Sequence, residues 1–156
     1  MSEKSNVTFQ MHPIGYVRSN GDRSHLEILE PYRPAMEALD RFSHVIVVWW
    51  ASQLDTEEAR NLMQCMPPYA DGEIAGVFAC RSPYRPNPVA LSVCEMISMD
   101  AANGLIPVQY IDAEDGTPIV DLKAYFPVSD RVRQARVPEW CQDWPEWVED
   151  AHLLEI

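Results

Sequence analysis

The chain has 156 residues, 47% of them hydrophobic, and a formal net charge of −12 at pH 7. This composition predicts a globular chain with a core of its own and argues against disorder. The negative charge excludes a general electrostatic affinity for nucleic acid or for an anionic membrane, because such affinity rests largely on neutralised phosphates.

The apolar residues and the cysteines restrict the compartment. No run reaches the roughly 18 apolar residues of a membrane span, and the first residues lack a secretory signal pattern. The four cysteines stand far apart without a C-x-x-C spacing, and the four histidines do not cluster. We therefore expect no metal site, and small buried thiols in a reducing compartment, the cytoplasm.

The first half of the chain begins with short strand-like runs. Residues 14–17 predict a strand that ends in a turn, and residues 25–30 can pair with it as a hairpin. A short helix at 35–39 comes next. The run 44–51 is the most apolar in the chain, and its valines and tryptophans favour a strand buried on both faces.

A helix with clear boundaries follows this strand. Asp55 is its predicted N-cap, with Glu58 three residues on in the manner of a capping box. Pro67 and Pro68 end it. The second half predicts further strands at 76–80, 89–97, 105–111 and 119–125. Near the C-terminus, tryptophans 140, 144 and 147 recur at helical spacing, which is typical of a packing face.

About seven strands at short spacing with two or three helices suit a mainly β fold with peripheral helices. We expect a single closed barrel of about seven strands, mostly antiparallel, with the helices outside it. The predicted organisation is one domain over residues 1–156, with a core at about 12–127. A C-terminal helical segment covers about 137–153.

The segment Arg81–Ser92 holds three prolines within six residues. Each proline fixes φ and lacks a backbone donor, so the segment is neither helix nor central strand. It predicts a stiff, extended loop between two apolar strands, carrying the polar side chains of Arg81, Ser82, Arg85 and Asn87. Arginine forks suit carboxylate or phosphate groups, which makes this loop a candidate binding loop. The alternative is a surface connection with solvated arginines.

A second unusual stretch is an acidic turn at residues 112–121. Asp112, Glu114 and Asp115 place three carboxylates within four residues, and their repulsion costs stability unless a cation or hydroxyl donors offset it. A solvated hairpin turn is the alternative reading. Together with the arginine loop, the turn suits a zwitterionic adenosyl ligand.

Three segments, at residues 42–44, 76–89 and 115–123, resemble the TsaA-like (YaeB/TrmO) family in order and spacing. The resemblance covers about residues 14–125. It implies a TsaA-like β-barrel that binds S-adenosylmethionine, as a homodimer with the site near the subunit interface. The best-known members methylate N6 of a modified adenosine next to the tRNA anticodon.

The resemblance also implies the cofactor-binding residues. It puts Arg81, the backbone around Val89 and the segment Glu114–Thr117 around the cofactor, and it adds the pair Ser52 and Gln53. The full predicted set is Ser52, Gln53, Arg81, Ser82, Arg85, Asn87, Val89, Asp112, Glu114, Asp115, Gly116 and Thr117. No catalytic base is assigned.

Departures from the family leave the methyl acceptor open. Residues 21–25 replace the Pro-Arg-Gln signature expected after the first strand, and the charge of −12 disfavours tRNA. Two alternatives stand beside tRNA methylation: a methyltransferase with a small-molecule acceptor, and a non-catalytic module that binds S-adenosylmethionine.

Overall fold

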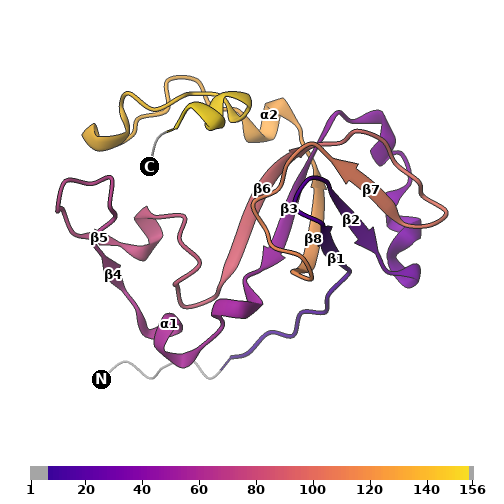
Figure 1. Ribbon diagram of the computed structural model, residues 1–156, viewed down its shortest axis with the longest axis horizontal. Coiled ribbons are helices and arrows are strands. Elements are labelled where there is room, and N and C mark those ends of the chain that lie inside the picture. The colour runs from indigo at the N-terminus through magenta and orange to yellow at the C-terminus, as the bar shows by residue number, and fades with distance from the viewer. Residues whose placement is uncertain (1–6, 155–156) are drawn as a thin grey trace.

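The computed structural model of the protein describes residues 7–154, and its centre is a six-stranded antiparallel sheet. The strands lie in the order β6-β3-β8-β1-β2-β7 (Figure 1). Their bounds are β1 Gly15–Ser19, β2 Ser24–Ile28, β3 His44–Trp50, β6 Val89–Glu95, β7 Leu105–Val108 and β8 Pro118–Ala124. The predicted first hairpin is confirmed, since β1 pairs with β2 along its whole length.

Short elements surround this sheet. Figure 1 shows α1, β4 and β5 set to one side of it, with the C-terminal segment above them. The bounds are α1 Glu57–Asn61, α2 Pro127–Asp130, β4 Gln64–Cys65 and β5 Ala75–Gly76, and six 3-10 segments: η1 Glu30–Met36, η2 Leu39–Arg41, η3 Ser52–Leu54, η4 Val77–Ala79, η5 Glu139–Cys141 and η6 Val148–Leu153. Within residues 7–154, no helix has the length and apolarity to cross a membrane.

The core lies on one face of the sheet. Val45 and Val47 of β3 are fully buried, whereas Ile46 and Val48 between them are partly exposed. Successive side chains of a strand point to opposite faces, so only one face of β3 meets the core. The prediction of a strand buried on both faces is therefore wrong, while the mainly β fold with peripheral helices is confirmed.

The predicted closed barrel is also wrong, because the sheet is open. Strands β6 and β7 form its two edges. Beyond the end of β6, an isolated bridge joins Met96 to Val108, and the amide of Ile97 donates to the Pro107 carbonyl at 2.9 Å. Strand β7 has only four residues. Within the described residues these edges share no strand ladder.

Several local predictions also need correction. The helix expected to end at Pro67 and Pro68 already ends at Asn61, and β4 follows it. The expected strand at 76–80 ends at Gly76, where the chain enters η4. Thr56, not Asp55, caps α1, because its side chain accepts the amide of Ala59 at 3.2 Å. The tryptophans near the C-terminus do not share one helix: Trp140 lies on η5, whereas Trp144 and Trp147 lie in the linker between η5 and η6. Proline at 138 and 145 explains the interruption, because it removes the backbone donors that a continuous helix needs.

Candidate functional site

A cleft of about 230 Å³ opens at one end of the sheet, between β3, the proline-rich loop and the acidic turn. Five of its nine lining residues belong to the predicted cofactor site, and four were not predicted. The predicted ones are Ser52, Gln53, Asp112, Glu114 and Thr117; the others are Trp49, Ala51, Leu54 and Pro83. Residues more than sixty positions apart in the sequence thus share one cavity.

The antiparallel pairing of β3 brings these segments together. At the end of β3, Trp49 lies opposite Ile119 of β8, and Trp50 lies opposite Val89 of β6. The amide of Ala51 then donates to the Pro88 carbonyl at 2.8 Å. The exit of β3 and the entries of β6 and β8 therefore meet at the same end of the sheet. The loops before β6 and β8 are the proline-rich loop and the acidic turn.

A chain of hydrogen bonds holds Asp112 at the cleft. The indole Nε1 of Trp49 donates to Ser92 Oγ at 2.9 Å, and Ser92 Oγ donates to Asp112 Oδ1 at 2.5 Å. Ser92 is buried in β6, while Asp112 is exposed. Ser92 thereby fixes one carboxylate oxygen of Asp112. Sequence reasoning missed Trp49 and Ser92; the alternation of β3 and β6 was the one available signal.

Hydrogen bonds to strand β1 hold the acidic turn in place. Gly116 adopts φ of +80° and its amide donates to the Val17 carbonyl at 2.8 Å, a backbone conformation that glycine adopts without strain. Asp115 Oδ1 accepts the amide of Ser19 at 2.9 Å. Asp115 and Gly116 do not line the cleft. They hold the turn that places Glu114 and the buried Thr117 there.

Arg85 stabilises the proline-rich loop from within. Its guanidinium donates to the carbonyls of Val77, Cys80 and Ser82 at 3.2, 3.2 and 3.0 Å. Its donors are therefore directed to the main chain of η4 and of the start of the loop rather than to the cleft. Arg81 is exposed and does not line the cleft either.

Hydrogen bonds from Arg60 join helix α1 to the proline-rich loop. Arg60 donates to Asp55 and to the Pro86 carbonyl, the latter at 2.9 Å, and its Nη1 lies 3.5 Å from Asn87 Oδ1. Trp50 Nε1 also donates to Asp55, at 3.0 Å. The hydrogen bond from Arg60 lowers the pKa of the Asp55 carboxyl, and the Trp50 donor adds to this.

The remaining predicted residues support the loop. Ser82 Oγ accepts the amide of Tyr84 at 3.2 Å. Val89 opens β6, and its amide donates to the Asn87 carbonyl at 2.7 Å. Ser82, Asn87 and Val89 do not line the cleft, so this conformation brings together only part of the predicted set.

The cleft suits a positively charged ligand. Asp112 and Glu114 contribute carboxylates, and none of the nine lining residues is Lys, Arg or His. Ser52, Gln53 and Thr117 add hydroxyl and amide groups that can orient polar parts of a ligand.

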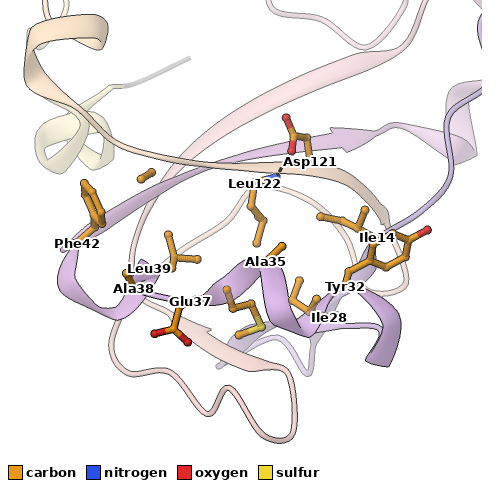
Figure 2. A pocket seen from close by; sticks show the side chains of 12 residues that line it. Ile14, Ile28, Tyr32, Ala35, Glu37, Ala38, Leu39, Phe42, Asp121 and Leu122 are labelled. Carbon is orange, nitrogen blue, oxygen red and sulfur yellow. Dashed lines mark hydrogen bonds between the residues drawn. The ribbon is translucent and has the colours of Figure 1, made fainter.

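A larger cavity of about 430 Å³ lies between η1, η2 and the sheet. Figure 2 shows the side chains of Ile14, Leu39 and Leu122 extending into it, whereas Asp121 points away. Its lining is mostly aliphatic and aromatic. Few groups there can orient a polar ligand, so the smaller cleft remains the candidate site.

Comparisons with known proteins show the family to which the chain is similar. The family model of the tRNA-methyltransferase O N-terminal domain matches residues 7–131. An S-adenosyl-L-methionine-binding protein of Archaeoglobus fulgidus is 33% identical over 111 residues, which are 71% of this chain and 75% of that protein. A protein of Pyrococcus horikoshii, named a probable S-adenosyl-L-methionine-binding protein, is 35% identical over 118 residues, 75% of this chain and 82% of the relative.

Solved structures of this family are also similar to the chain. The crystal structure of TrmO from Pseudomonas aeruginosa superposes with a TM-score of 0.68 at 30% identity, covering 88% of this chain and 63% of that one. The chain thus spans somewhat less than two thirds of that enzyme's length. Another relative, from Archaeoglobus fulgidus, is matched over only 31% of its length.

Proposed function

The chain belongs to the tRNA-methyltransferase O N-terminal domain family, and from this premise we propose that it is an S-adenosylmethionine-dependent methyltransferase. The observation that carries the proposal is the cleft. It gathers Ser52, Gln53, Glu114 and Thr117, which the resemblance assigns to the cofactor, and it has no cationic lining residue. The sulfonium and ammonium groups of S-adenosylmethionine are cations, so the charge of the cleft matches this cofactor.

The reaction is an in-line displacement at the sulfonium methyl group. An acceptor atom attacks the methyl carbon, and sulfur leaves with the electron pair as S-adenosylhomocysteine. Such a transfer depends mainly on holding the two reactants in line, with a group to take the acceptor's proton. The rigid end of the sheet provides that fixed frame, since three neighbouring strands place the lining residues.

We propose tRNA as the acceptor, with N6 of an adenosine next to the anticodon as the methylated atom. A chain of charge −12 needs its cations gathered on one surface. Arg18 is paired with Glu27, and Arg33 donates to the carbonyls of Ile28 and Ala102. These arginines are committed to the fold. The exposed segment with arginines 131, 133 and 136 is therefore the better docking surface.

The negative charge favours a second candidate, a small-molecule acceptor. Labelled S-adenosylmethionine should be incubated with total tRNA and, separately, with a metabolite extract. Label in tRNA supports the first candidate, and label only in the extract supports the second. No transfer to either would reject the methyltransferase proposal.

The docking surface has its own test. The triple variant Arg131→Ala, Arg133→Ala, Arg136→Ala should bind the cofactor normally and methylate tRNA poorly. The expected loss of tRNA methylation is larger at low salt concentration, because each lost phosphate contact removes a salt-dependent part of the affinity for tRNA. Full tRNA methylation by this variant would show that these arginines are not the docking surface.

We also propose that the chain works as a homodimer in the cytoplasm. The dimer rests on the family resemblance, and the compartment on the cysteine pattern. Trp147 is half exposed near the C-terminus, with the guanidinium of Arg131 4.6 Å from its ring centroid, and it can contribute to an interface. Light scattering that gives a monomer mass at tens of micromolar would reject the dimer.

A further inference from the structure

The cleft contains two carboxylates, and the structure holds them in different ways. Asp112 is fixed by a hydrogen bond from Ser92, which is itself oriented by Trp49. Glu114 lies on the acidic turn, and its backbone carbonyl accepts the Thr117 amide at 3.1 Å. Within residues 7–154, no hydrogen bond or ion pair restrains the Glu114 side chain. The two groups are therefore suited to different tasks.

A proton acceptor in methyl transfer must be held at a defined position next to the proton that it removes. General base catalysis requires hydrogen-bond reach to the proton that is removed, and the rate falls steeply when the geometry is loose. A carboxylate whose side chain is anchored by a second residue meets this requirement best. Ser92 sits in β6 opposite Val47 of β3, so the anchor is part of the sheet rather than of a loop.

We propose that Asp112 is the proton acceptor of the methyl transfer and that Ser92 and Trp49 are its positioning residues. This inference rests on the proposed methyltransferase function. Ser92 Oγ holds Oδ1, which leaves Oδ2 of Asp112 for the acceptor's N–H or O–H group. Glu114 remains available for the positive charge of the cofactor.

The step balances without a further reactant. The acceptor's lone pair forms a bond to the methyl carbon while the carbon–sulfur bond breaks, and the sulfur keeps the electron pair. The sulfonium becomes the neutral thioether of S-adenosylhomocysteine. The proton from the acceptor passes to Asp112 Oδ2 and then to water through the open side of the cleft, since Asp112 is exposed.

Kinetics with total tRNA as acceptor, combined with calorimetric titration of S-adenosylmethionine, test this assignment. Asp112→Asn should lower kcat by about a hundredfold or more, within the usual range for a lost general base, with the cofactor Kd within about threefold of wild type. Ser92→Ala should lower kcat about tenfold and leave Kd unchanged, because the carboxylate remains but is no longer held. Ser92→Thr, which keeps the hydroxyl, should restore most of the rate.

The matched control is Val93→Ala on the same strand, next to Ser92 but outside the hydrogen-bond chain, and it should keep wild-type kcat. Two results would overturn the assignment: a wild-type kcat in Ser92→Ala, or an Asp112→Asn variant with unchanged kcat and a raised Kd, which would make Asp112 a cofactor ligand. If the wild type transfers no methyl group at all, the proposed function fails first. A failure of the proposed function is thus seen with the wild-type protein alone, whereas a failure of the Asp112 assignment is seen only in the variants.

Discussion

The stiffness of the proline-rich loop should depend on Arg85. Its guanidinium donates three hydrogen bonds, to the carbonyls of Val77, Cys80 and Ser82. These bonds tie both the 3-10 segment η4 and the start of the loop to one side chain. The change Arg85→Ala removes all three donors and leaves three carbonyls to be hydrated by solvent.

The expected loss of stability follows from these contacts. A hydrogen bond to a charged group contributes about 1.5–3 kcal/mol. Arg85 is only partly buried, so water replaces much of what is lost, and we expect about 2–3 kcal/mol in total rather than the full sum. For a chain of this size, about 2–4 °C per kcal/mol gives a decrease in Tm of about 4–12 °C.

Thermal unfolding followed by circular dichroism measures this decrease. The matched control is Arg81→Ala, which removes the same side chain four residues earlier at an exposed position. A surface substitution of this kind should change stability by no more than about 0.5 kcal/mol. Equal Tm values for the two variants would refute the assignment of a structural role to Arg85.

Three further outcomes are expected. Arg81 does not line the cleft, so Arg81→Ala should leave the calorimetric Kd for S-adenosylmethionine unchanged; a loss of about 1.5–3 kcal/mol, that of a hydrogen bond to a charged group, would add Arg81 to the site. Burial, assisted by the negative charge of Asp112, raises the pKa of the Cys94 thiol to about 12, so a thiol reagent at pH 8 should label partly exposed Cys65 and spare Cys94. Rapid labelling of native Cys94 would contradict this. The lowered pKa of Asp55 stabilises the fold above the ordinary Asp pKa, and this contribution is lost as the pH falls through the lowered value. Asp55→Asn should therefore reduce the fall of Tm at acid pH, by the equivalent of about 0.2–1 kcal/mol. An unchanged dependence of Tm on acid pH would count against the ion pair of Asp55 with Arg60.

The sequence predicted the strands that have local signals. The hairpin of β1 and β2 follows from alternation around a turn, and β3, β6 and β8 follow from β-branched and aromatic runs. Five of the cleft residues were also predicted. The carboxylates of the acidic turn singled out Asp112 and Glu114, whereas Ser52, Gln53 and Thr117 were implied by the family resemblance. The strand predictions need only the order of residues along the chain.

Long-range contacts could not be predicted in the same way. The hydrogen bond from Trp49 to Ser92 joins residues 43 positions apart and depends on the register between β3 and β6. The side chain of Arg85 has the same chemistry whether it binds a ligand or three carbonyls, so composition alone could not choose between them. The open sheet depends on the short length of β7, where the apolar run 105–111 suggested a longer strand.

In the proposed function, the cleft at the end of β3 binds S-adenosylmethionine and recognises its positive charge. The most direct measurement is calorimetric titration with S-adenosylmethionine and with S-adenosylhomocysteine, whose sulfur is neutral. Glu114→Gln should weaken the binding of S-adenosylmethionine by up to about fivefold, the equivalent of an exposed ion pair of about 1 kcal/mol. It should weaken the binding of S-adenosylhomocysteine less. Glu37→Gln, which changes the lining of the other cavity, should affect neither. Absence of binding heat with the wild-type protein, or equal weakening of both ligands by Glu114→Gln, would contradict the claim.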